Sequence, residues 1–400
     1  MSEVGISSIV GYIPKLRLLR KSVAESNAWL APNLMGKGKG TRSMASWDED
    51  SVTMSVEAAR RLLGPEDDRS HVDNVFLAST TMPFADRLNS GIVRAALTLE
   101  ESTQCTDISS TLKCGTTALI NAIAAVQSGK SNYSLVLSSD KRKSRVGSAQ
   151  ELDFGDASAA IGINNKDIIA KVLATSSVSV DFVDHFRAPN EEFDYNWEER
   201  WIRDEGYLKI IPKLINNLLK ENDINPSEIK KFILPCIFPR VPQTISKICG
   251  IDPENVVDNL ALNVGDSGSA HPLLMLTHVL ENAEPNEKIL VCSFGGGGDA
   301  ILLETTKLIS KFKNDESISA LLDNGVEETN YMKYLTFNDL VKWEKGMRGE
   351  IDRKTALTTL YRHNDAIIGL VGGKCSKTGT IQFPASRISV SPNSPDIDTQ

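Results

Sequence analysis

The stretch Thr106-Asp-Ile-Ser-Ser-Thr-Leu-Lys-Cys-Gly-Thr-Thr-Ala-Leu-Ile-Asn-Ala-Ile-Ala-Ala-Val-Gln-Ser-Gly129 carries the strongest structural signal in this chain. A run rich in serine and threonine enters a tight turn at Lys113-Cys114-Gly115, and a helix is predicted to follow. Apolar residues occupy most of the surface of that helix, which predicts burial nearly all round. Its first turn consists of small residues, so other backbone is expected to approach it closely.

Cys114 lies in this first turn. The N-terminus of a helix carries free N–H groups and the positive end of the helix dipole, which would stabilise a thiolate. Cys114 is therefore a candidate nucleophile. A structural thiol packed against small residues is the alternative, and it is the commoner role of a buried cysteine.

Composition limits the classes of function. The 400 residues are enough for two or three domain-sized units. A net charge of −8 without a basic stripe argues against nucleic-acid binding. The six cysteines show no pairing pattern, no signal peptide precedes the first strand-like run, and no apolar run reaches membrane-spanning length. We therefore expect a cytoplasmic protein with reduced thiols and no membrane segment.

Strands and helices alternate along the chain, and two halves share one plan. Each half ends with a small-residue helix, a buried strand, a Gly/Asp turn and a final strand rich in Ala and Ile. These segments span 116–127, 133–139 and 154–163 in the first half, and 269–280, 289–293 and 294–304 in the second. The pattern predicts a duplicated α/β unit with halves 1–165 and 166–312, followed by a linker, a hairpin and a disordered tail over 313–400.

Four ordered motifs carry a resemblance to a known family. They are Asp107-Ile-Ser-Ser-Thr-Leu-Lys-Cys-Gly-Thr-Thr-Ala-Leu119, Phe154-Gly-Asp-Ala-Ser-Ala-Ala160, Gly265-Asp-Ser-Gly-Ser-Ala270 and Phe294-Gly-Gly-Gly-Gly-Asp-Ala300. They resemble the thiolase superfamily, in its branch of 3-ketoacyl-acyl-carrier-protein (ACP) synthase III and 3-hydroxy-3-methylglutaryl-CoA (HMG-CoA) synthase. The resemblance implies a thiolase-like duplicated five-layer α/β/α/β/α fold with a short irregular C-terminal extension. It also implies a tunnel for the pantetheine arm of an acyl thioester, and a dimer.

The family chemistry needs a cysteine nucleophile, a histidine, an asparagine and, in HMG-CoA synthases, a glutamate acid/base. Carried over by motif, the cysteine position is Leu112, the histidine position Cys236, the asparagine position Asp266 and the glutamate position Thr80. All four are substituted. Leucine cannot be acylated, and an aspartate places negative charge where negative charge would develop in the reaction.

Three interpretations follow. The first is an acyl-CoA-binding or scaffolding subunit of an acyltransferase complex that has lost the standard nucleophile. The second is an active acyltransferase or condensing enzyme with a relocated site, for which Cys114, Cys236, Asp266 and His271 are the candidate residues. For His271, a helix-capping or core role is the alternative. The third is a structural oligomer without a ligand.

A coenzyme A thioester, if bound, is expected near Trp29, Lys37, Lys39 and Arg42, because an indole and cations suit an adenine ring and phosphates. A solvated basic loop is the alternative for this segment. No cofactor is expected to be bound covalently. The expected protein partners are a second copy of the chain, or a related thiolase-fold or OB-fold subunit.

The C-terminal segment Gly373-Lys-Cys-Ser-Lys-Thr-Gly-Thr-Ile-Gln-Phe-Pro384 resembles the start of the zinc ribbon in an acyl-CoA-associated OB-fold domain. A zinc site of that type needs two pairs of cysteines, and here Cys375 stands alone. We therefore predict a degenerate zinc-ribbon-like hairpin that binds no metal.

Overall fold

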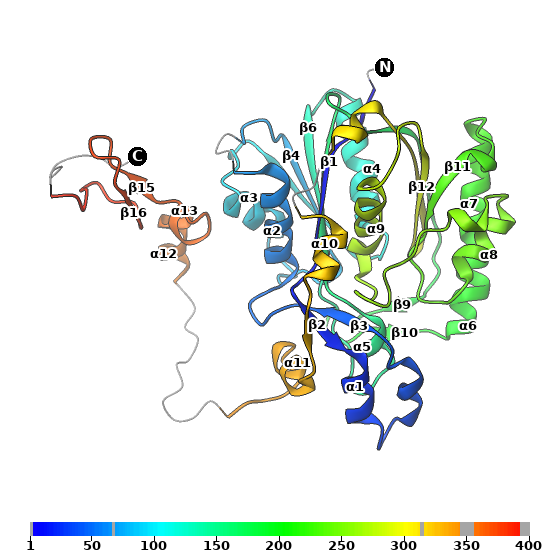
Figure 1. Ribbon diagram of the computed structural model, residues 1–400. Helices are drawn as coiled ribbons and strands as arrows, with labels where there is room; N and C mark the ends of the chain where they lie inside the picture. The colour runs from blue at the N-terminus through cyan, green and yellow to red at the C-terminus, as the bar shows by residue number, and fades with distance from the viewer. Residues whose placement is uncertain (1–2, 66–68, 313–315, 345–355, 393–400) are drawn as a thin grey trace.

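The computed structural model describes residues 3–65, 69–312, 316–344 and 356–392. Its centre is a nine-stranded sheet in the order β11-β12-β13-β8-β1-β7-β6-β4-β5 (Figure 1). The first half supplies β1 (Gly5–Tyr12), β4 (Asn74–Ala78), β5 (Gln104–Ile108), β6 (Tyr133–Asp140) and β7 (Ala157–Asn164). The second half supplies β8 (Ala170–Ser179), β11 (Ile229–Ile233), β12 (Lys288–Phe294) and β13 (Gly297–Thr305).

Strand pairing repeats between the halves. In the first half β1 pairs antiparallel with β7, β7 antiparallel with β6, and β6 parallel with β4. In the second half β8 pairs antiparallel with β13, β13 antiparallel with β12, and β12 parallel with β11. The halves join where Gly5 and Ile6 of β1 face Lys171 and Ala170 of β8. The repeated pattern agrees with the predicted duplication.

The helices form three layers around the two halves of the sheet (Figure 1). Helices α4 (Cys114–Gln127) and α9 (His271–Leu280) lie in the middle and contact strands of both halves. Helices α2 (Ser51–Leu63) and α3 (Asn89–Ala96) cover the outside of the first half, and α7 (Leu208–Glu221) with α8 (Val241–Ile248) covers the second. The expected five-layer α/β/α/β/α fold is confirmed.

Glycine at the start of α4 allows the two central helices to meet. A Cβ atom at Gly115 would lie 2.3 Å from the carbonyl oxygen of Ser269, directly before α9. A side chain there would therefore separate the two halves. The predicted all-round burial holds only for the first two turns, because Asn121, Ala124 and Gln127 are exposed further along the helix.

A smaller layer packs below the sheet in Figure 1. It contains β2 (Leu16–Leu19), α1 (Arg20–Asn27), a 3₁₀ turn Pro32–Lys37, β3 (Thr41–Met44), α5 (Gln150–Asp153), β14 (Val326–Glu328) and α11 (Tyr331–Phe337). Helix α10 (Ile318–Asp323) lies above this layer and contacts β1 and α9. Strand β14 pairs with β2, and the side chains of Ile318 and Tyr334 are fully buried. Part of the expected linker therefore belongs to the packed body of the protein.

The segment between β8 and α7 contains β9 (His185–Phe186), β10 (Tyr195–Asn196), α6 (Glu199–Trp201) and a π-helical stretch Ile202–Tyr207. Beyond residue 355 the chain forms α12 (Leu357–Arg362), α13 (Asn364–Ile367), β15 (Gly373–Lys374) and β16 (Ile381–Gln382). Strands β15 and β16 pair antiparallel. Residues 393–400, most of the tail expected to be disordered, lie outside the described residues.

Candidate active site

One pocket brings together three of the residues that the resemblance assigns to catalytic positions. A cavity of about 70 Å³ is lined by Leu112, which lies two residues before α4, by Cys236 after β11 and by Asp266 before α9. The remaining wall includes Phe154, Tyr207, Phe238 and Phe294, with Asp184 and His185 from the segment before α7. Residues far apart in the sequence thus converge where the resemblance implies an active site.

Asp266 is held by an ion pair. Its carboxylate lies 3.3 Å from the Arg142 guanidinium and accepts a hydrogen bond of 3.0 Å from the backbone N–H of Gly268. Arg142 also donates to Asp194 at 2.9 Å and lies over the ring of Phe154, 3.7 Å from its centroid. This arrangement fixes a carboxylate in the wall of the pocket.

Arg142 is almost completely buried, yet it remains charged. Burial opposes its charge, but the carboxylates of Asp266 and Asp194 outweigh burial and raise the pKa of the guanidinium. Burial likewise opposes the charge of Asp194, and the neighbouring Arg142 overcomes it and holds the pKa of that carboxyl below its usual value. A second cation, Arg187, lies 2.7 Å from Asp194. The pocket wall is therefore a buried network of alternating charges.

Cys236 lines the pocket as a protonated thiol. Burial raises its pKa to about 12, so the thiol keeps its proton at pH 7. The hydroxyl of Tyr207 lies beside it and donates to the carbonyl of Pro235 at 3.4 Å. Burial also raises the pKa of Tyr207. Neither group is ionised at neutral pH.

Cys114 does not line this pocket. It is the first residue of α4, and its side chain is fully buried in the central hydrophobic core. Burial, with a contribution from the negative charge of Asp140, raises the pKa of its thiol. Any effect of the helix dipole is smaller than this desolvation, so the structure favours the structural-thiol interpretation.

His271 uses both ring nitrogens in structural hydrogen bonds. Its Nδ1 accepts from the backbone N–H of Ser267 at 3.1 Å, and its Nε2 lies 2.7 Å from the carbonyl oxygen of Asn259. Because a backbone N–H can only donate, Nε2 carries the proton and donates to Asn259. The imidazole therefore holds the loop before α9 in place and has no free nitrogen for proton transfer.

Thr80 lies outside the pocket and lines a neighbouring cavity of about 360 Å³. Its backbone N–H and hydroxyl donate to the buried carboxylate of Asp140, at 2.7 and 3.1 Å. Its carbonyl oxygen accepts from Arg187. The Thr80 hydroxyl, at the position that the resemblance assigns to the glutamate of HMG-CoA synthases, is thus tied to an internal carboxylate.

The four residues expected to meet coenzyme A fall into two groups. Trp29 is 83% exposed, Lys39 is exposed, and Lys37 forms an ion pair with Asp153 at 2.6 Å. Arg42 is completely buried and cannot meet a ligand phosphate from solvent. It donates to the carbonyl of Glu151 at 2.9 Å and to Tyr334 Oη at 3.0 Å, which makes it a packing residue.

The sequence reasoning missed Asp184, His185, Asp194 and Arg142. The first three belong to the segment 182–207, whose cluster of aromatic and arginine residues is visible in the sequence. Nothing in that cluster shows which part of the fold it covers. Within the described ranges, no group of three His, Cys, Asp or Glu residues is placed to hold a metal ion. None of the helices in these described ranges is long and apolar enough to cross a bilayer.

Comparisons with known proteins agree with this fold. Residues 219–303 match the family described as 3-Oxoacyl-[acyl-carrier-protein (ACP)] synthase III C terminal. The hydroxymethylglutaryl-CoA synthase of Methanopyrus kandleri is 26% identical over 356 residues, covering 86% of this chain and 98% of that protein. That of Caldivirga maquilingensis is 27% identical over 351 residues, covering 86% and 99%.

Solved structures show the same fold. An HMG-CoA synthase complexed with CoA superposes with a TM-score of 0.72 at 18% identity, covering 89% of this chain and 95% of that one. The curacin-pathway HMG synthase in complex with apo donor-ACP gives 0.73 at 16% identity, covering 85% and 89%. The chain thus has a thiolase-like fold. It is similar in sequence to the HMG-CoA synthases over most of its length.

Proposed function

We propose that this protein binds an acyl thioester without forming an acyl-enzyme, as a binding or scaffolding subunit of an acyltransferase complex. The observation that carries the proposal is the position of Leu112. It lies in the pocket beside Cys236 and Asp266, where the family resemblance requires an acylated cysteine. An alkyl side chain has no electron pair to attack a thioester carbonyl.

The proposed ligand is a coenzyme A or carrier-protein thioester. Two structures that share the fold contain CoA or a donor ACP. A second cavity of about 340 Å³ adjoins the pocket and shares Phe154, Ile202 and Phe238 with it. Asp153, the partner of Lys37, lines the same cavity, and Trp197 on its rim is half exposed. This cavity has the size that a pantetheine arm would need, and its wall combines apolar and aromatic side chains with polar ones.

Isothermal titration calorimetry with acetyl-CoA tests the proposal, paired with acid quench and peptide mass spectrometry. We expect saturable binding and no acetyl adduct on any cysteine. A Phe238→Trp variant, which narrows the passage between the two cavities, should weaken binding. The absence of binding by acetyl-CoA, acetoacetyl-CoA and CoA would contradict the proposal.

The alternative is an active acyltransferase or condensing enzyme with a relocated nucleophile. Its supporting observation is that Cys236 lines the pocket. The burial that raises the pKa of this thiol to about 12 argues against it, as does the absence of a free histidine nitrogen on His271. An acetyl adduct on Cys236 that disappears in Cys236→Ala would establish this alternative instead.

We further propose a dimer, or a heteromer with a related thiolase-fold or OB-fold subunit. Strand β5 ends the sheet order on the first half, so one of its edges is available to pair with another chain. The hairpin β15–β16, with its resemblance to a zinc-ribbon start, is a second candidate contact for an OB-fold subunit. Light scattering at micromolar concentration should give about twice the chain mass of 43.7 kDa, and a monomer would contradict the homodimer.

A further inference from the structure

One acid/base pair in the pocket has no role in the proposal above. The carboxylate of Asp184 lies 3.0 Å from Nδ1 of His185, and the Asp184 side chain is buried. A carboxylate this close to Nδ1 favours the tautomer that carries its proton on Nδ1, which leaves a lone pair on Nε2. Among the described residues, no hydrogen bond to Nε2 is found. This is the arrangement of a histidine that is oriented by an acid and open to a reactant.

The position of His185 places it between two spaces. It lines the pocket of Leu112, Cys236 and Asp266, and it also lines the cavity of about 360 Å³ that holds Thr80. The walls of this cavity of about 360 Å³ carry hydroxyl groups and charges, including Ser109, Ser110, Thr111 and Arg187. A polar cavity of that size holds water. His185 thus separates a space suited to an acyl group from a space suited to water.

The other ionisable groups of the pocket are not available for proton transfer. Cys236 and Tyr207 hold their protons because burial raises both pKa values. Asp266 is paired with Arg142, and Asp194 with both Arg142 and Arg187. His185 is the group of this wall that combines an orienting partner with an open nitrogen.

We propose that His185, oriented by Asp184, activates water for hydrolysis of the bound acyl thioester. The reaction rests on the ligand class proposed above and needs no acyl-enzyme. The water oxygen attacks the thioester carbonyl carbon as its proton passes to Nε2. The tetrahedral intermediate then collapses, the C–S bond breaks, and the proton on Nε2 passes to the leaving sulfur. A carboxylic acid and a free thiol are released, and His185 returns to its starting state.

Thiol release from acetyl-CoA, followed with a thiol reagent, measures this activity. We expect turnover by the unmodified chain and a loss of about 100-fold or more in kcat for His185→Gln. Binding of a thioether analogue of acetyl-CoA should be unchanged in that variant. His185→Ala should regain activity when imidazole is added, which a purely structural histidine would not allow.

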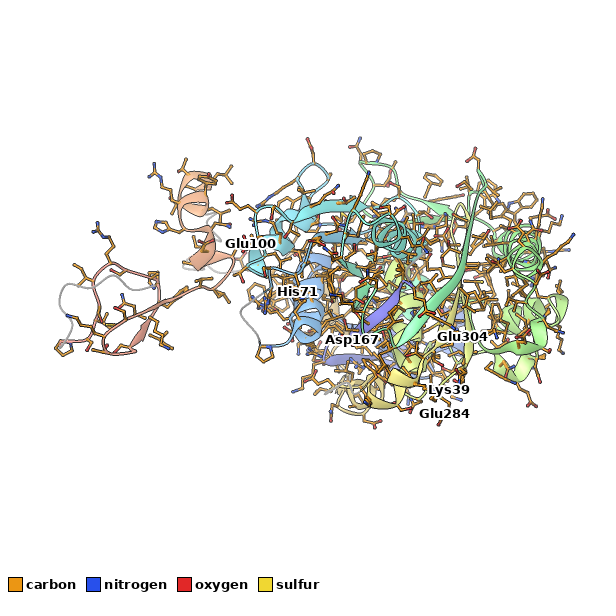
Figure 2. All side chains as sticks on the ribbon, turned by 90° about the horizontal axis from the view of Figure 1, so that it is seen from above. Lys39, His71, Glu100, Asp167, Glu284 and Glu304 are labelled. Carbon is orange, nitrogen blue, oxygen red and sulfur yellow. The ribbon has the colours of Figure 1, made fainter. Side chains whose placement is uncertain are left out.

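His71→Gln is the matched control. His71 lies among the blue elements of the first half and contacts the Tyr133 ring edge-on, with centroids 5.0 Å apart (Figure 2). Its loss should leave hydrolysis unchanged. Binding of the thioether analogue without hydrolysis by the unmodified chain would overturn this inference and leave the binding function intact. Equal hydrolysis by His185→Gln would also overturn it, and absence of binding would remove both proposals.

Discussion

The guanidinium of Arg142 lies between the carboxylates of Asp266 and Asp194, at 3.3 and 2.9 Å, and joins the pocket to the segment before α7. Arg142 and Asp194 are both largely buried. Removing one partner from such a network leaves an uncompensated buried charge, which costs about 3–5 kcal/mol. The two ion pairs of Arg142 are therefore needed for the stability of the pocket, and they also set its electrostatics.

Arg142→Met should lower the free energy of unfolding by about 3 kcal/mol or more, since Asp266 and Asp194 lose their shared cation. Urea unfolding followed by circular dichroism measures the change. Arg145→Met is the control, because Arg145 is exposed and lies 5.9 Å from the Phe193 ring centroid. That variant should change stability by less than about 0.5 kcal/mol. Equal effects of the two substitutions would show that the buried network contributes little.

Leu112→Cys should not restore condensation of acetyl-CoA with acetoacetyl-CoA. The new thiol would lack a histidine at position 236 and would face the carboxylate of Asp266, which opposes negative charge in the transition state. Product formation, followed by mass spectrometry, should stay at the level of the unmodified chain. Substantial turnover by this single variant would show that the family positions assigned to Cys236 and Asp266 are incorrect.

Substitutions of Lys37, Lys39 and Trp29 should change the affinity for coenzyme A without changing the stability of the protein. Lys39→Ala combined with Trp29→Ala removes an exposed cation and an exposed indole, and should weaken binding by about 1 kcal/mol, close to fivefold in Kd. Calorimetry checks this, with thermal unfolding as the second measurement. Unchanged affinity would place the ligand phosphates elsewhere.

Arg42→Met should show the opposite behaviour. The buried side chain bonds Glu151 and Tyr334 and lies 3.6 Å from the Asp156 carboxylate, so its loss leaves Asp156 without a cation. We expect a decrease of about 3 kcal/mol or more in the free energy of unfolding. A variant of full stability and reduced CoA affinity would contradict the packing role.

Stability should fall as the pH rises above about 9. Burial raises the pKa of Cys236 and Cys249 to about 12, whereas an exposed cysteine of the unfolded chain titrates near 8.5. Between these values the folded chain keeps protons that the unfolded chain has lost, so each thiol lowers stability by about 1.4 kcal/mol per pH unit. The contribution is fully present below the unfolded pKa. Urea unfolding at pH 8 and pH 10 should show the decrease, and Cys249→Ala should make it smaller; an unchanged slope would contradict the assignment.

Much of the architecture follows from local sequence patterns. Apolar periodicity and the turn at Lys113-Cys114-Gly115 predicted α4, and the shared endings of the two halves predicted a duplicated α/β fold. The resemblance assigns Leu112, Cys236 and Asp266 to altered positions of the family motifs, and this expectation uses only their neighbours in the chain. These properties depend on residues close together in the sequence.

Only the tertiary structure shows which residues line the pocket and how they are paired. Cys114 and Leu112 are two residues apart, yet only the packing of α4 shows that one lies in the core and the other faces the cavity. The sequence led us to expect Arg42 at the surface, but strand β3 places its side chain in the interior. Nothing in the sequence around His185 or around Arg142 indicates that these two residues line the same pocket. Burial and long-range ion pairing decide what such groups can do, and both arise only when distant segments pack together.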